Sequence, residues 1–94
     1  MLRFDWDEKK NQANRKNHGV WFEEAAQVFD DAQAILFFDE AHSTGEDRFP
    51  LLGMSGSARV LLVCHCEREA GPTIRIVSAR KAKPREVRRY EEGI

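Results

Sequence analysis

The chain has 94 residues, of which 41% are apolar and 33% charged, and its net charge is −1. Such a length favours a single domain over residues 1–94 with a modest hydrophobic core. No apolar run is long enough to span a membrane, and the opening segment MLRFDWDEKK lacks the apolar region of a secretory signal, so we expect a cytoplasmic protein.

Charge is distributed unevenly along the chain. From residue 72 onward, three acidic residues oppose seven basic ones, which are Arg75, Arg80, Lys81, Lys83, Arg85, Arg88 and Arg89. That segment therefore carries +4, and residues 1–71 carry −5, which gives the total of −1. A basic segment in a slightly acidic chain favours a polyanionic partner, without identifying it.

Two helices are predicted first. Asp5 or Asp7 can cap the first helix and Gly19 can end it, although the segment between them is polar nearly all round. In the following segment, VWFEEAAQVF, apolar residues recur at the spacing of a short amphipathic helix, namely Phe22, Ala25, Ala26 and Phe29.

Four strands are predicted next, and the clearest are VLLVCHCE and TIRIVSAR. They are preceded by a strand over Gln33–Phe38, a polar turn over Asp39–Asp47 and a strand in RFPLLGMS. Pro50 would make this second strand an edge strand or a bulged one, because proline cannot donate to a sheet ladder. Gly56 marks the turn that follows it.

The segment REAGP joins the last two strands in a hairpin. If Glu67 pairs with Thr73, then His65 lies opposite Arg75, and both share a face with Glu67. The other face of this hairpin is nearly all apolar and would be the core face: Leu62, Cys64, Cys66, Ile74, Ile76 and Ser78.

A final helix is predicted from Pro84, because proline is favourable at the first helical position. Val87 and Tyr90 would share its apolar stripe. The complete pattern predicts an α+β fold with two N-terminal helices, a four-stranded and mainly antiparallel sheet, and a C-terminal helix.

The sequence resembles the BrnT ribonuclease toxins of bacterial type II toxin–antitoxin systems. The resemblance rests on FDWDEKKNQANRKNHGVWFEEAAQVF, GED, RVLLVCHCER and IRIVSARKAKPREVRRYEE, in that order. It implies a compact RelE-like domain and RNA cleavage without a metal or cofactor. It also implies neutralisation by a BrnA-type antitoxin, whose ribbon-helix-helix part would make the only contact with DNA. That antitoxin would cover the basic face with acidic or apolar segments.

The chain departs from the family pattern at three places. Trp21 replaces a small hydroxyl residue that would cap the second helix, so that helix loses a cap. Cys66 stands where threonine is usual, and Lys83-Pro84 replaces the hydroxyl cap of the last helix.

The implied reaction is attack of a ribose 2′-hydroxyl on the adjacent phosphate, which requires proton transfer and cations. We expect Arg75, Arg80 and Lys81 to hold the phosphate, and His65 or Glu67 to transfer the proton. Further RNA contacts are expected from Arg59, Arg85 and Tyr90.

Each of these residues also has a structural interpretation. The cations are equally consistent with solvated charges, His65 with a half-buried core residue, Glu67 with a hairpin ion pair, and Tyr90 with packing beside Val87. For His18, a role as charge partner of the helix dipole is preferred to a catalytic one. No metal site is expected, because Cys64 and Cys66 would face away from His65. Two other functions stay open, a non-catalytic RNA-binding module and a partner-docking protein.

Overall fold

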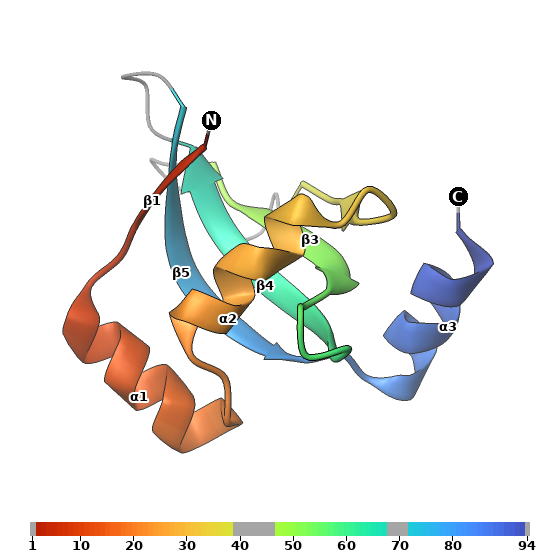
Figure 1. Ribbon diagram of the computed structural model, residues 1–94, viewed down its shortest axis with the longest axis horizontal. Coiled ribbons are helices and arrows are strands. Elements are labelled where there is room, and N and C mark those ends of the chain that lie inside the picture. Colours follow the sequence, from red (N-terminus) through yellow and green to blue (C-terminus); the bar gives the residue numbers. More distant parts are fainter. Residues whose placement is uncertain (1, 39–46, 68–71, 94) are drawn as a thin grey trace.

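A computed structural model of the protein describes residues 2–38, 47–67 and 72–93 (Figure 1). Its elements are β1 (Arg3–Asp5), α1 (Glu8–His18), α2 (Phe22–Gln27), the 3-10 turn η1 (Val28–Asp30), β2 (Ile35–Leu36), β3 (Phe49–Met54), β4 (Val60–Glu67), β5 (Thr73–Lys81) and α3 (Pro84–Glu92). The first four residues of the predicted REAGP loop, most of the polar turn before β3, and His42 lie outside the described residues. In the described part of the chain, no helix is long and apolar enough to cross a membrane.

The sheet has five strands in the order β1-β5-β4-β3-β2. The four predicted strands are present and antiparallel, and a fifth, β1, lies parallel to β5. The prediction of four strands was therefore wrong by one. The missed strand has only three residues, and Asp5 belongs to it as the partner of Arg75 rather than to the first helix.

Helix α1 begins and ends at the residues that its capping signals indicate. The Asp7 side chain accepts a hydrogen bond from the Lys9 amide, and Gly19 adopts the left-handed conformation, with φ of 73°, that stops the helix. The buried residues of α1 are Asn11 and Asn14, so polar side chains rather than apolar ones anchor it.

The two buried asparagines join α1 to the rest of the fold. Asn14 donates to the carbonyls of Val20 and Ala79, each over 2.8 Å, and accepts from the Ala79 amide over 3.1 Å. The side-chain amide of Asn14 thus satisfies the backbone N–H and C=O of Ala79, at a point of β5 that lies beyond the three residues paired with β1. Asn11 accepts from the Phe22 amide over 2.7 Å. Trp21 provides no cap, as predicted, and Asn11 satisfies the first amide of α2 in its place.

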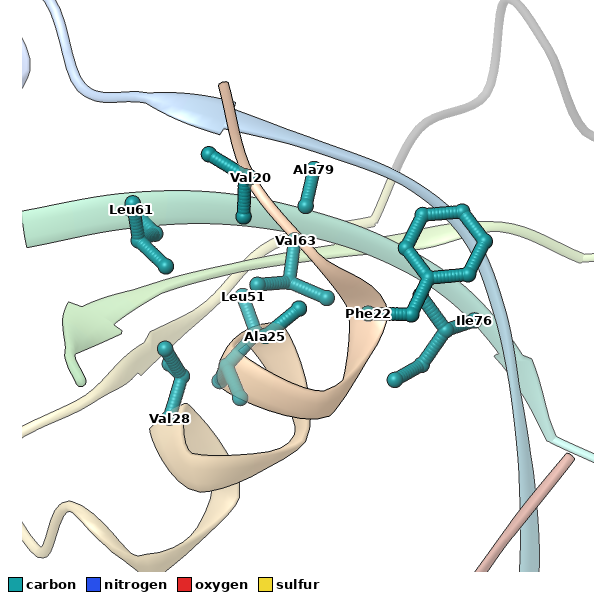
Figure 2. Close-up of a cluster of buried hydrophobic side chains, with 9 residues drawn as sticks. All are labelled: Val20, Phe22, Ala25, Val28, Leu51, Leu61, Val63, Ile76 and Ala79. Carbon is teal, nitrogen blue, oxygen red and sulfur yellow. The ribbon is translucent and has the colours of Figure 1, made fainter. Parts of the chain in front are cut away.

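The core lies between one face of the sheet and the segment that contains α2 and η1 (Figure 2). Four residues of that segment face five of the sheet, and the cluster consists of Val20, Phe22, Ala25, Val28, Leu51, Leu61, Val63, Ile76 and Ala79. Gly53 allows β3 to approach η1 closely, because a Cβ there would lie 2.8 Å from Val28 Cγ1.

A β-bulge between β4 and β5 changes the predicted register of the hairpin. Val63 pairs with Ala79, but His65 pairs with Ile76 and Cys66 with Arg75, so Val77 is an extra residue in β5. The predicted pairing of His65 with Arg75 was wrong. Leu61, Val63 and His65 face the core, so the predicted core face of β4 was wrong, whereas Ile74 and Ile76 of β5 are buried as predicted.

Pro50 lies in an interior strand, which corrects its assignment to an edge strand. The carbonyl of Pro50 accepts from the Phe37 amide over 2.9 Å, so its backbone polar groups face β2. The two-residue ladder between β2 and β3 pairs Leu36 with Leu51 and ends there. Pro50, which has no amide hydrogen to donate, therefore lies just beyond this short ladder.

Helix α3 stands apart from α1 and α2 (Figure 1) and contains no buried residue. Lys83 provides no side-chain cap, and instead its amide donates to the Glu86 carboxylate over 2.8 Å. At the other end of α3, the Tyr90 hydroxyl donates to Asp31 Oδ2 over 2.6 Å. The first contact caps the helix, and the Tyr90–Asp31 hydrogen bond joins its other end to the body of the protein.

Candidate functional site

The sheet face opposite α2, called here the outer face, presents Leu62, Cys64, Ser78 and Arg80. A cavity of about 290 Å³ lies against this face. Its remaining lining residues are His18 at the end of α1, Arg48 and Pro50 at the start of β3, and Ala79 of β5. We call it the cationic cavity, because two arginines and a histidine are among the residues that line it.

His18 and Arg48 are the cavity residues that the sequence did not indicate. His18 is the last residue of α1, and the Asn14 contacts with β5 place that end of the helix beside the sheet. Arg48 immediately precedes β3. An imidazole can transfer protons and a guanidinium can bind a phosphate with two parallel hydrogen bonds, so the combination suits a phosphodiester.

Arg80 is the one leading candidate that lines this cavity. Its guanidinium forms two hydrogen bonds with the Glu86 carboxylate, over 2.9 and 3.0 Å, and a third with the Lys81 carbonyl over 3.2 Å. The Arg80 hydrogen bond lowers the pKa of Glu86, and the same contact raises the pKa of Arg80. Arg80 is therefore a fixed cation at the cavity wall, and a bound phosphate would share it with Glu86.

Arg75 and Lys81 do not converge on Arg80. Arg75 shares the outer face, but it lies five residues away along β5 and donates to Asp5 over 2.8 Å. Lys81 pairs with Leu61 and points to the opposite face, where its charge contributes to lowering the pKa of Glu24. The structure thus separates the three expected phosphate ligands.

His65 is buried in the core, with 2% of its surface exposed. Its ring lies 4.8 Å from the Phe29 ring and 5.9 Å from the Phe49 ring, measured between centroids. Burial lowers the pKa of His65, and it outweighs the raising effects of the Val63 backbone and the Glu67 charge. Its Nδ1 atom has no hydrogen-bond partner among the described residues. Of its two interpretations, the geometry favours the structural one.

Glu67 is exposed at the end of β4, paired with Ile74. It shares the face of His65, as expected, and that face is opposite the cationic cavity. A proton transfer by Glu67 within the cavity is therefore not favoured by the geometry.

Arg59 and Tyr90 have structural partners. Arg59 binds the Glu24 carboxylate and donates to the Gly19 carbonyl over 3.2 Å, so it joins the start of β4 to α2. Its hydrogen bond lowers the pKa of Glu24. Tyr90 is held by Asp31, and that hydrogen bond raises the pKa of Tyr90 to about 12.

Arg85 lines a second cavity next to the first. Cys66 is buried and Cys64 partly buried, and both lie on the outer face rather than toward the α2 core. Among the described residues, no group of three or more histidine, cysteine or acidic side chains could hold a metal ion.

Comparison with known proteins gives two findings. Residues 6–86 match the family model described as "Ribonuclease toxin, BrnT, of type II toxin-antitoxin system". Among solved structures, the fold matches the crystal structure of the Brucella abortus ribonuclease toxin BrnT, with a TM-score of 0.69 and 22% sequence identity over 88% of this chain and 99% of that one. No curated protein matches the sequence.

Proposed function

The chain belongs to the BrnT family of ribonuclease toxins from type II toxin–antitoxin systems, and we propose that it cleaves RNA in the cationic cavity by attack of the ribose 2′-hydroxyl. The observation that carries this proposal is the meeting of His18, Arg48 and Arg80 around one space. These are the groups that the reaction requires, because charge develops on the phosphate while protons move at both oxygens.

Arg48 and Arg80 would bind the nonbridging phosphate oxygens, and His18 would accept the 2′-hydroxyl proton. As the 2′-oxygen forms its bond to phosphorus, the bond from phosphorus to the 5′-oxygen breaks and that oxygen takes up a proton. The products would be a 2′,3′-cyclic phosphate and a 5′-hydroxyl. These roles need no metal ion.

Among the other candidates, Arg75 remains a proposed RNA contact, because it shares the outer face with Arg80. His18 replaces His65 and Glu67 as the proposed proton-transfer group. This choice rests on the position of His18 at the cavity and on the burial of His65.

The partner proposed for the toxin is a BrnA-type antitoxin with a ribbon-helix-helix part. The toxin would then contact operator DNA only through this antitoxin, and the complex would act in the cytoplasm. Type II membership supports a protein antitoxin.

The decisive experiment is cleavage of a defined RNA by the purified protein in excess chelator. We expect His18→Gln to lower the cleavage rate by about 10²-fold or more while RNA affinity changes little. Arg80→Gln should lower both the cleavage rate and the RNA affinity. Arg88→Gln is the matched control, because Arg88 is exposed on α3 and outside the residues that line the cavity. RNA binding without fragments from the parent protein would instead indicate a non-catalytic RNA-binding module.

A further inference from the structure

A second cavity, of about 370 Å³, lies between α3 and the outer face of the sheet. We call it the α3 groove, and it is lined by Phe37, Pro50, Leu52, Leu62, Arg85, Glu86 and Arg89. Four of these residues are apolar and come from the sheet or the end of β2, whereas the three charged residues come from α3. The α3 groove is therefore an apolar surface with a charged wall.

The wall of the α3 groove is cationic. Glu86 is its only acidic residue, and both of its carboxylate oxygens bind Arg80. Arg85 and Arg89 are exposed, and in the described contacts of α3 neither guanidinium is paired with a carboxylate. An occupant that complements this groove has apolar side chains flanked by carboxylates.

The chemistry of the groove favours a peptide over a nucleobase. A base is recognised through stacking and through hydrogen bonds along its edges, and the apolar residues of the groove could supply only the stacking. Leu62, which is only partly buried, instead suits aliphatic side chains. The Phe37 ring, 37% exposed, extends the same apolar surface outward.

The α3 groove and the cationic cavity are adjacent. Pro50 and Leu62 line both, and the Arg80–Glu86 ion pair joins the wall of one to the wall of the other. A chain segment seated in the groove therefore lies next to the proposed phosphate site. It also competes for Arg80, if its carboxylates replace Glu86.

We infer that the α3 groove is the seat of an acidic, apolar segment of the antitoxin, which blocks the cationic cavity from this position. The inference rests on the proposed function, because it assigns a surface to the partner named there. It resembles other interfaces in which an amphipathic segment places apolar anchors in a groove.

The test uses a purified antitoxin of the BrnA type, the partner proposed above. Its affinity is measured by calorimetry for the parent, for Phe37→Asp and for Leu36→Asp. The two variants add the same charge at neighbouring positions on opposite faces of the sheet, and Leu36 is even more exposed, at 54%. We expect Phe37→Asp to weaken binding at least tenfold and to cleave RNA as the parent does, whereas Leu36→Asp binds normally.

A second pair of variants keeps the test valid if Phe37→Asp fails to fold. Arg89→Glu should also weaken antitoxin binding about tenfold, while Arg88→Glu, one residue away and outside the groove lining, should not. Unchanged affinity in both Phe37→Asp and Arg89→Glu overturns the inference. So does a loss of RNA affinity alone, which assigns the groove to substrate, or conversion of a parent dimer to a monomer by Phe37→Asp, which assigns it to a second copy.

These results are separable from a failure of the proposed function. If the parent does not cleave RNA but binds the antitoxin through Phe37, then the groove stands and the catalytic assignment falls. If the parent cleaves RNA and neither groove variant changes the affinity for the antitoxin, then the catalytic assignment stands and the groove assignment falls.

Discussion

Arg80 and Glu86 form a two-point ion pair that fastens the end of β5 to the first turn of α3. The same pair positions the only leading candidate arginine that reaches the cationic cavity. Glu86 therefore has two opposing effects, because it orders Arg80 at the cavity and also occupies the hydrogen bonds that a phosphate would take.

Releasing Arg80 should strengthen RNA binding. We expect Glu86→Gln to raise the affinity for an uncleavable 2′-O-methyl RNA and to steepen the slope of log affinity against log salt concentration by about 0.7, the value for one added single-strand phosphate contact. Fluorescence anisotropy at several salt concentrations measures both quantities. Glu91→Gln makes the same change of net charge on the same helix without releasing Arg80, and equal slopes for the two variants would contradict the prediction.

The buried imidazole of His65 should make the fold sensitive to mild acid. Its folded-state pKa is lowered below 6.5, so the unfolded chain binds a proton first. The contribution of neutral His65 to the free energy of unfolding is therefore fully present above about pH 6.5. It decreases as the pH falls toward the folded-state pKa, by at most about 1.4 kcal/mol per pH unit for one proton.

Chemical denaturation between pH 5 and about 7 tests this effect. The described carboxylates with lowered pKa values are Glu24, Glu86 and Asp31, whose ordinary values are 4.5, 4.5 and 3.8, so they titrate below this range. His65→Gln should remove the decrease, and His18→Gln, at an exposed position, should retain it. A decrease of the same size in both variants would assign it to another group.

His65 also shows where sequence-based prediction of this fold stops. The strands β4 and β5 were predicted because their apolar, β-branched runs are long, and the core face of β4 was not, because both of its alternations are largely apolar. The bulge at Val77 then shifts one half of β5 against β4 by a residue. Strand periodicity does not predict this shift, because it assumes an uninterrupted two-residue alternation.

The same limit applies to the candidate site. Arg80 was found because charge density is visible in a sequence, and α1 was bounded correctly because caps are local signals. His18 was not assigned to the site, because its position depends on the contact of Asn14 with Ala79, 65 residues away. Strand β1 was missed for a similar reason, since three residues become a strand only by pairing with β5.

Asn14 should be among the polar residues least tolerant of substitution. Asn14→Asp replaces an amide that donates to two carbonyls with a carboxylate that repels them, inside a buried site. We expect a loss of about 2 to 4 kcal/mol in the free energy of unfolding. Asn17→Asp changes the same atoms at an exposed position of α1 and should be nearly neutral. Denaturant titration compares the two, and similar stabilities would rule out the proposed role of Asn14.

Tyr90 is the only tyrosine of the chain, so the phenolate absorbance reports on it alone. Its pKa should be about 12, because ionisation would place a second negative charge beside the Asp31 carboxylate. Since this pKa is raised, the Tyr90–Asp31 hydrogen bond stabilises the folded state fully below about pH 10, and this stabilisation is lost as the pH rises toward 12. Ultraviolet titration of the parent and of Asp31→Asn measures it, with circular dichroism to verify folding at each pH. Titration of the folded parent near 10 would contradict the hydrogen bond.

The contacts of Asp5 with Arg75 and of Asn14 with Ala79 impose an order on folding. The partners are 70 and 65 residues apart, so β1 and α1 have no sheet edge to bind until β5 has been synthesised. Such distant pairings slow folding, because the entropy cost of closing the long loop comes before the contacts stabilise the closed state. His18 reaches Arg80 only after that closure. During translation, the cationic cavity is therefore among the last features of the molecule to form, and a nascent chain lacks it until its C-terminal strand has emerged from the ribosome.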